Sequence, residues 1–540
     1  MLVGEYLMKA LEATNIRHVF GIQGDYVLKF YELLSKSPLE IINVCDEQSA
    51  GFAADAYARI GGFGVVCVTY GVGGLKLVNS TAQAFAEHSP VLVISGSPGT
   101  SERSGEALLH HKVRSFQTQL NIFKEVTVAQ ATLEDKENAA AEIDRVIDAI
   151  LKSKRPGYIE LPRDMLQKKV SLAPKRSRER MTIDQQALAE AVNEVTRMLA
   201  AAHRPVVVAG IDVHRFGVQQ LFLDFLEHSG LPFVTGVLGK GVIPETHPQF
   251  LGVYAGAMSP DTVREAVEGA DFIIGIGPLI TDLSTGMFTS VIDKGKTVAV
   301  EQGSISVAHH VYPGIPMADF LKALTAALPA SQKTASWSPK GDPLPFSPQS
   351  GRKITMERLI LCVNVFLDDH TTVIAEPGDP LFAGLDLFIR GISDFLSPAY
   401  YASLGFAIPA CVGVQLASPG RRALALVGDG SFQMTGMEIS TLARYGLNPI
   451  IIVLNNGGYG TFRPMVDGPF NDIQPWRYAD LPKIVGSGTG FDVTDEEELF
   501  HALQAAKDNK SGFSIIDVRI DKYDISSRLK RLTENLKRRV

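Results

Sequence analysis

Residues 423–460 read ALALVGDGSFQMTGMEISTLARYGLNPIIIVLNNGGYG, and this stretch decides the predicted fold. The apolar run 423–427 predicts a strand of a parallel sheet that is buried on both faces, and 450–454 predicts a second one. A helical pattern lies between them. Open α/β sheets bind ligands at the carboxyl ends of their strands, so the polar segments 428–431 and 455–458 are predicted to meet at one binding edge.

The polar groups of that edge suit a magnesium ion and a diphosphate. Asp429 offers a carboxylate oxygen, Asn456 an amide oxygen and Gly458 a backbone carbonyl, and Mg2+ prefers such ligands together with phosphate oxygens and water. The helix that begins near Ser431 points free N–H groups at the same place, where a diphosphate can accept them. A glycine-rich turn without a ligand is the alternative, and the pairing of GDG with NN argues against it.

The pairing of GDG with NN resembles the cofactor motif of the thiamin diphosphate (ThDP)-dependent enzymes. By that resemblance Asp429, Asn456 and the Gly458 carbonyl are Mg2+ ligands. The resemblance covers nearly the whole chain and implies an α/β protein of three doubly wound parallel-sheet domains. The expected domains are a pyrimidine-binding domain at 1–170, a Rossmann-like middle domain at 185–330 and a diphosphate- and Mg2+-binding domain at 354–540, with linkers at 165–184 and 331–353.

Composition limits the classes of partner. The 540 residues carry a net charge of −7, which argues against a nucleic-acid or anionic-membrane surface. No apolar run approaches the roughly 20 residues of a membrane span. The first 20 residues predict an amphipathic helix rather than a signal peptide. Four scattered cysteines indicate a reduced protein, so we expect a cytoplasmic location.

The middle domain carries an incomplete nucleotide motif. Residues 271–277, DFIIGIG, resemble half of a dinucleotide fingerprint and lack the full G-x-G-x-x-G. Some relatives hold FAD or ADP in this domain. Here a structural role is the favoured interpretation.

Glu47 is the candidate that activates the cofactor. It follows a predicted strand and precedes a helix, within the segment CDEQSAGFAADAYAR. In the family an acidic residue at this place hydrogen-bonds the pyrimidine ring nitrogen, and a desolvated carboxylate shares its proton readily with such a partner. The alternative is a carboxylate that is favoured only by the dipole at the start of a helix.

The resemblance implies further cofactor contacts. Leu404 would separate the two rings of bent ThDP, and the Ala402 carbonyl would accept from the pyrimidine amine. Many relatives carry a hydroxyl residue where Pro377 stands, which puts one contact there in doubt. The other implied cofactor residues are Thr69, Asn79, Glu376, Gly378, Asp379, Gly428, Gly430, Ser431 and Tyr459, and Gly71, Glu87 and His88 lie in segments that also match.

Adjacent histidines give the most discriminating signal. His110 and His111 in an extended segment would point to opposite faces, so a simple metal clamp is not expected. Together with VFGIQGD at 19–25, the pair resembles the pyruvate and indolepyruvate decarboxylase branch of the family. By that resemblance Asp25, His110 and His111 are the acid–base groups that act on the substrate.

One departure from the branch concerns the substrate pocket. Relatives usually place a catalytic glutamate where this chain has Phe462, and an apolar residue there is similar to the phenylpyruvate-type decarboxylases. Loss of one positioned acid costs about 10²-fold in rate if nothing replaces it. An apolar wall favours aryl or long-chain substrates by roughly 0.8 kcal/mol per buried CH2. The candidates for that wall are Phe462, Met465, Phe382 and Phe388.

These observations predict a carboxy-lyase that uses ThDP and Mg2+. The expected reaction is non-oxidative decarboxylation of a 2-oxo acid to an aldehyde and CO2, with an aryl, branched or long-chain substrate such as phenylpyruvate, indolepyruvate or a branched-chain 2-oxo acid. The alternatives are a carboligase of the acetohydroxyacid synthase or benzoylformate decarboxylase type, and a non-catalytic ThDP-binding homologue. In the family the cofactor lies between two subunits, so a dimer is the minimal expected unit and a homotetramer is favoured.

Overall fold

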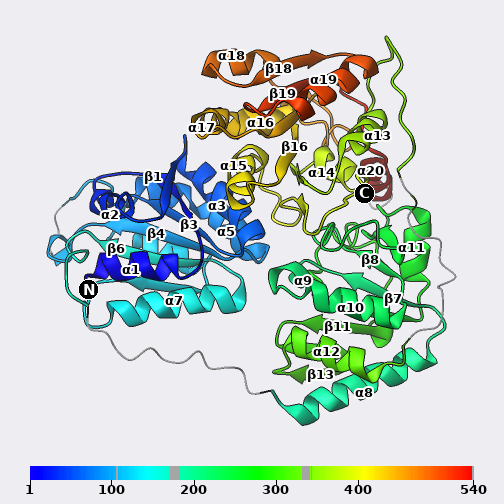
Figure 1. Cartoon of the computed structure of the whole chain (residues 1–540), viewed down its shortest axis with the longest axis horizontal. Helices are drawn as coiled ribbons and strands as arrows, with labels where there is room; N and C mark the ends of the chain where they lie inside the picture. Colours follow the sequence, from blue (N-terminus) through cyan, green and yellow to red (C-terminus); the bar gives the residue numbers. More distant parts are fainter. Residues whose placement is uncertain (105–107, 171–182, 331–340, 342, 538–540) are drawn as a thin grey trace.

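The computed structural model describes residues 1–104, 108–170, 183–330, 341 and 343–537. It contains three α/β domains, each built on one mostly parallel sheet, which confirms the predicted fold class (Figure 1). The N-terminal domain is blue to cyan in that view, the middle domain green and the C-terminal domain yellow to red. Most of the two predicted linkers, 171–182 and 331–340, lies outside the described residues, and the exact domain bounds stay a prediction.

The N-terminal domain has a six-stranded sheet in the order β2-β1-β3-β4-β6-β5, with every neighbouring pair parallel. Its strands are β1 (His18–Ile22), β2 (Glu40–Asn43), β3 (Gly64–Val68), β4 (Val91–Ser97), β5 (Ala129–Thr132) and β6 (Gly157–Pro162). Its helices are α1 (Val3–Glu12), α2 (Leu28–Leu34), α3 (Glu47–Gly61), α4 (Val72–Lys76), α5 (Val78–Ala86), α6 (Thr118–Lys124) and α7 (Ala139–Ser153).

The middle domain has a seven-stranded sheet in the order β13-β12-β11-β10-β7-β8-β9. Its strands are β7 (Pro205–Ala209), β8 (Phe233–Thr235), β9 (Phe250–Val253), β10 (Phe272–Ile276), β11 (Thr297–Glu301), β12 (Ser304–Val307) and β13 (His310–Pro313). Its helices are α8 (Gln185–Ala201), α9 (Asp212–Arg215), α10 (Gln219–Ser229), α11 (Asp261–Glu268) and α12 (Met317–Ala327). The pairs β11–β12 and β12–β13 are antiparallel, so this sheet is not purely parallel as predicted.

The C-terminal domain has a six-stranded parallel sheet in the order β15-β14-β16-β17-β19-β18. Its strands are β14 (Thr371–Ala375), β15 (Phe395–Leu396), β16 (Arg422–Gly428), β17 (Ile450–Asn455), β18 (Thr489–Val493) and β19 (Ser514–Arg519). Its helices are α13 (Met356–Phe366), α14 (Asp379–Gly384), α15 (Ala407–Ala417), α16 (Asp429–Thr435), α17 (Ile439–Arg444), α18 (Leu481–Val485), α19 (Glu496–Asp508) and α20 (Ser527–Lys537). The strand order repeats that of the N-terminal sheet, so the two domains share one topology.

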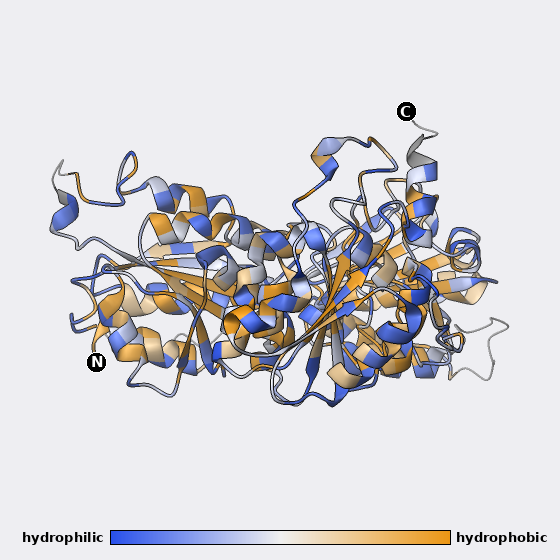
Figure 2. Ribbon diagram, turned by 90° about the horizontal axis from the view of Figure 1, so that it is seen from above, coloured by the Kyte–Doolittle hydropathy of each residue, from blue (hydrophilic) through white to orange (hydrophobic). Residues whose placement is uncertain are grey.

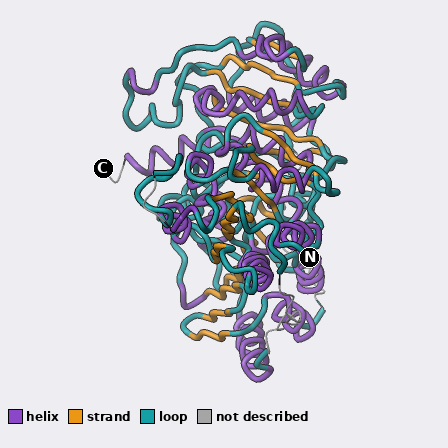
Figure 3. The backbone as a smooth tube through the Cα atoms, turned by 90° about the vertical axis from the view of Figure 1, so that its left-hand side faces the viewer, coloured by secondary structure: helices purple, strands orange, loops and turns teal. Residues whose placement is uncertain are grey.

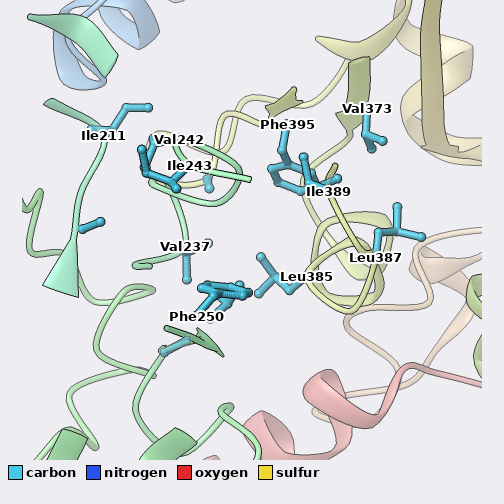
Figure 4. Close-up of a cluster of buried hydrophobic side chains, with 14 of the residues drawn as sticks. Ile211, Val237, Val242, Ile243, Phe250, Val373, Leu385, Leu387, Ile389 and Phe395 are labelled. Carbon is cyan, nitrogen blue, oxygen red and sulfur yellow. The ribbon is translucent and has the colours of Figure 1, made fainter. Parts of the chain in front are cut away.

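The C-terminal sheet joins the other two domains because its two faces belong to different cores. Leu424 and Leu426 of β16 pack in a core that continues into the middle domain, whereas Ala425 and Val427 pack in a core that continues into the N-terminal domain. Figure 4 shows the first of these cores, where Val237 and Phe250 of the middle domain approach Leu385 from the C-terminal domain. The apolar residues concentrate on the inner strands, which the helices flank (Figures 2 and 3).

The contact between the N-terminal and C-terminal domains depends on a close helix pair. Helix α3 packs against α15, and an added Cβ at Gly413 would lie 2.1 Å from the Ala53 carbonyl oxygen. Only glycine permits that approach. In the described part of the chain, none of the helices has the length and apolar character that a membrane crossing needs.

Candidate active site

Three polar residues follow three adjacent strands of the N-terminal sheet. Asp25 comes after β1, Glu47 after β2 and Thr69 after β3, and these strands lie in the order β2-β1-β3. Because parallel strands end at the same edge, the residues gather there. An added Cβ at Gly24 would lie 2.5 Å from the Thr69 Cβ, so the loop that carries Asp25 lies directly against Thr69.

The structure brings Asp25, His110 and His111 together. His110 Nε2 lies 2.8 Å from Asp25 Oδ2, and the two histidine rings meet edge to face with centroids 4.7 Å apart. One ligand atom from each of the three side chains lies within 4.8 Å of the others. The expectation that the two histidines point apart was wrong, because His111 has a φ of 68° and the chain turns instead of extending.

Tyr26 supports this cluster and was missed by the sequence reasoning. Its ring stacks on that of His110 at a centroid distance of 4.8 Å, and its hydroxyl donates to the His110 carbonyl at 3.3 Å. The ring of His111 is held by the Tyr70 carbonyl, which lies 3.1 Å from its Nδ1. In the sequence, Tyr26 directly follows Asp25 and Tyr70 directly follows Thr69, and this adjacency is the signal that could have indicated the support. Both tyrosines are buried in the structure.

Glu47 is the first residue of α3, so the helix-start interpretation and the functional one apply to the same carboxylate. Its side chain is only 13% exposed, and its Oε2 lies 2.9 Å from Lys76 Nζ. Lys76 also pairs with Asp46, the residue that caps the helix. The ion pair with Lys76 was not predicted, because α4 lies far from Glu47 in the sequence.

The second binding edge lies at the carboxyl ends of β16 and β17, as predicted. Asp429 is buried, and its Oδ2 accepts hydrogen bonds from the backbone N–H groups of Gly457 at 2.7 Å and Gly458 at 3.1 Å. Its Oδ1 accepts from Gly430 at 2.8 Å. Burial raises the pKa of Asp429 to about 6, and the three N–H donors oppose that rise.

Asn456 lies beside this carboxylate. The Gly458 nitrogen lies 3.3 Å from Asn456 Oδ1 and 3.1 Å from Asp429 Oδ2. Both side-chain oxygens therefore lie beside the same backbone N–H group. The turn requires glycine, because Gly457 has a φ of 77° and a Cβ at Gly458 would lie 1.9 Å from the Asn471 carbonyl oxygen. A carboxylate oxygen and an amide oxygen placed this close together match the oxygen donors that Mg2+ takes.

The surrounding residues shape the same edge. The ring of Tyr459 covers Gly430, where an added Cβ would lie 2.8 Å from its Cε1. The space beside Gly428 is open, because an added Cβ there would meet no atom closer than Pro380 at 4.0 Å. Ser431 is buried in the first turn of α16. The hydroxyl of Tyr478, which sequence reasoning missed, donates to the Asp429 carbonyl at 3.3 Å.

Two predicted cofactor residues on the neighbouring loop are engaged within the chain. Glu376 is buried and accepts from the N–H groups of Gly405 and Ala407, both at 2.7 Å. Asp379 accepts from the Ser526 N–H at 2.9 Å. Burial raises the pKa of Glu376 to about 7 and that of Asp379 to about 6. Gly378 has a φ of 101° between them, so this loop anchors α15 and the C-terminal segment.

The segment around Leu404 contacts the N-terminal domain. Asn79 Nδ2 donates to Ser403 Oγ at 2.7 Å, and Ala402 has a φ of 58°. Leu404 is half-buried. Thr69 Oγ1 is buried and has no hydrogen-bond partner among the described residues, which leaves it available for a ligand.

Glu87 and His88 connect domains. Glu87 forms an ion pair with Arg59 at 2.9 Å and accepts from the Tyr400 N–H at 2.8 Å. His88 Nδ1 lies 2.8 Å from Asp212 in the middle domain. Glu87 and His88 lie in segments that resemble the family, and in this structure both residues contact another domain.

Comparison with protein families assigns all three domains to one class. The family model described as the thiamine pyrophosphate enzyme, N-terminal TPP binding domain, matches residues 1–124. The central-domain model matches 192–328 and the C-terminal TPP binding domain model matches 385–518. Thiamine pyrophosphate is another name for ThDP.

Known proteins narrow the class further. The chain is 35% identical to an indole-3-pyruvate decarboxylase of Azospirillum brasilense over 551 residues, which cover 100% of this chain and 99% of the relative. It is 33% identical to an alpha-keto-acid decarboxylase of Mycobacterium leprae, with 98% and 95% covered. It is 32% identical to pyruvate decarboxylase 1 of Pisum sativum, with 98% and 90% covered.

The chain belongs to the ThDP-dependent 2-oxo acid decarboxylases. It is therefore a lyase that uses ThDP to remove CO2 from a 2-oxo acid. In this decarboxylase the cluster of Asp25, His110 and His111 lies at the edge of the N-terminal sheet, whereas Asp429 and Asn456 lie at the edge of the C-terminal sheet. The roles of the individual residues stay predictions.

The four wall candidates of the decarboxylase lie in different environments. Phe462 and Met465 are 51% and 45% exposed, on the irregular segment that follows the Gly458 turn. Phe382 and Phe388 are buried at 6% and 3% exposure. Phe382 packs within a core cluster, and Phe388 lines a cavity with residues of α13. Their place in a substrate wall stays a prediction.

Proposed function

We propose that this decarboxylase acts on 2-oxo acids with an aryl or a long or branched apolar side chain. The observation that carries the proposal is Phe462, a half-exposed aromatic side chain four residues after Gly458. An apolar side chain next to the diphosphate edge gains from removing substrate carbon from water. The name of the Azospirillum brasilense relative, an indole-3-pyruvate decarboxylase, is that of an enzyme for an aryl 2-oxo acid and supports the proposal.

Mg2+ is the proposed partner of the diphosphate at the second edge. Asp429 and Asn456 would supply hard oxygen ligands beside the glycine turn. The Gly458 carbonyl, which accepts from the Gly460 N–H at 2.9 Å, is the third ligand that the family resemblance implies. An ionised carboxylate in a buried place needs a compensating charge, and a bound cation provides it. The residues present therefore fit the ion.

The chain's own residues have separate proposed tasks. Bound ThDP supplies the electron sink that decarboxylation needs. The Glu47 carboxylate holds a proton at the pyrimidine end of the cofactor, where its low exposure keeps water away. His110 and His111 hold and deliver protons at their ring nitrogens, and Asp25 orients the His110 ring through the bond to its Nε2.

Self-association is proposed on the family resemblance. Glu47 and its partner Lys76 belong to the N-terminal domain, whereas Asp429 and its donors Gly457 and Gly458 belong to the C-terminal domain. In the resembling family the cofactor lies between subunits, so we propose a dimer as the minimal active unit and favour a homotetramer. A cytoplasmic location likewise stays a prediction.

A substrate panel tests the proposal. Aldehyde formation from pyruvate, 3-methyl-2-oxobutanoate, phenylpyruvate and indolepyruvate should give the highest kcat/KM with an aryl substrate. Phe462→Ala should lower the aryl preference over pyruvate by about tenfold, the effect of roughly two buried CH2 groups. Phe288→Ala is the matched control, because that phenylalanine is 71% exposed on the middle domain. Pyruvate as the best substrate of the wild-type enzyme, or equal effects of the two variants, would contradict the proposal.

A further inference from the structure

One face of the middle sheet has a helical cover over only part of its strands. Helices α8, α10 and α12 cover the opposite face, where Val207, Ile274 and Val298 are buried with them. A parallel sheet of this kind is normally buried by helices on both faces. On the second face α11 packs against Val206, Val234 and Ile273. The irregular segment 278–292, which contains neither helix nor strand, faces Val208 and Ala299 across the remaining part of that face.

A cavity of about 320 Å3 lies between that sheet face and the segment 278–292. Val208, Ile273 and Ala299 form its floor, and Leu279 and Ile280 belong to the segment that forms its other side. This volume is within the range of small-molecule sites, which are concave and mostly apolar. The cavity therefore has the size and the lining of a binding site.

The covering segment exposes apolar side chains that a ligand would cover. Ile280 is 74% exposed and Phe288 is 71% exposed, although both line the cavity. The backbone there is strained, because Met287 and Phe288 follow Gly286 with φ values of 57° and 59°. The strained turn is held in place by the Met287 N–H, which donates to the Asp282 carbonyl at 2.6 Å. Strain that is maintained in this way is typical of functional sites.

The polar groups around the cavity favour a ligand other than a nucleotide. The N–H groups of Gly210 and Gly236, which would have to cradle a diphosphate, donate instead to strand carbonyls at 2.9 Å. The hydroxyl of Ser290 bonds that of Tyr254 at 2.6 Å. Lys294 is the cation of the lining, and it is exposed without an ion pair to any described residue.

We propose that this cavity binds an apolar monocarboxylate, at a site separate from both catalytic edges. The apolar body of the ligand fills the space over Val208 and Ala299, and its carboxylate pairs with Lys294 Nζ at the rim. The one carboxylate of such a ligand is complementary to Lys294, the one cationic residue of the lining, and its apolar part is complementary to the apolar side chains that form the rest of the cavity. This function is additional to decarboxylation and does not depend on it.

Titration of the full-length enzyme, loaded with ThDP and Mg2+, with 2-naphthoate tests the proposal. Calorimetry should show binding that Gly236→Leu weakens by more than tenfold. Gly236 lines the cavity, and an added Cβ there meets no atom closer than the Ala209 carbonyl oxygen at 4.0 Å, so a larger side chain can start from this position into the cavity. Decarboxylase activity should be unchanged in this variant.

A pair of lysine variants tests the carboxylate contact. Lys294→Gln should weaken 2-naphthoate binding about two- to fivefold, as expected for an exposed ion pair. Lys296→Gln is the matched control, since Lys296 lies on the same turn and pairs with Asp293. Absence of binding to the wild-type enzyme would overturn the proposal. So would equal affinity in Gly236→Leu, equal effects of the two lysine variants, or tighter binding of ADP than of 2-naphthoate.

Discussion

The Asp25→Asn variant tests whether Asp25 contributes to catalysis rather than to the folding stability of the protein. Asp25 and His110 form an ion pair at 2.8 Å, and their side chains are 47% and 55% exposed. Exposed pairs of this kind contribute about 0.2–1 kcal/mol to folding. A positioned acid–base group contributes about 10²–10⁴-fold in rate. We therefore expect a fall in kcat of about 10²-fold or more, with a change in the free energy of unfolding below about 1 kcal/mol.

The assay measures aldehyde formation with an excess of an aldehyde-reducing enzyme, and urea unfolding measures stability. His310→Gln is the matched control, because His310 Nδ1 lies 2.9 Å from Glu194 and its side chain is 69% exposed on the middle domain. The control should lose a similarly small amount of stability and no activity. Near-normal turnover in Asp25→Asn, or a loss of several kcal/mol of stability, would refute the assignment of Asp25.

The remaining predictions concern two carboxylates, Glu47 and the buried Glu376. Glu47→Gln should abolish aldehyde formation while circular dichroism shows a folded chain, because an amide cannot hold the proton at the pyrimidine end; turnover close to wild type would count against its role. Glu376 keeps its proton in the folded state up to about pH 7, whereas its ordinary pKa is 4.5. The unfolding free energy should therefore fall as pH rises through that window, by on the order of 3 kcal/mol at most. Urea titrations at pH 5 and pH 8 should show this fall in the wild-type enzyme and a flatter response in Glu376→Gln; parallel responses would contradict it.

The diphosphate edge was predictable from sequence because it depends on local patterns. Continuous apolar runs marked β16 and β17, and parallel strands end at one edge. Asp429 and Asn456 therefore had to lie close together, and the hydrogen bonds to the Gly458 N–H show that they do. The structure gathers Asp25, Glu47 and Thr69 at the edge of the N-terminal sheet for the same physical reason, because each follows one of three adjacent parallel strands.

Features that depend on turns and long-range packing were not predictable. The left-handed turn at His111 reverses the direction of its ring, and alternation along an extended strand cannot show such a turn. Strands β12 and β13 are short and partly exposed, so they lack the apolar run that marks a buried strand. Helix α20 is rich in basic residues, yet it buries Leu529 and Leu532, because its apolar face finds a partner only in the folded domain.

The most direct test of the central claim is calorimetric titration of the apoenzyme with ThDP, with and without Mg2+. The wild-type enzyme should bind ThDP tightly only when Mg2+ is present. Asp429→Asn should lower that affinity by about 100-fold or more, because the buried site loses its charged ligand. If Asp429→Asn binds ThDP as tightly as the wild-type enzyme does, or if the wild-type enzyme binds ThDP equally well without a metal, the Asp429 and Asn456 edge is not the metal-dependent cofactor site.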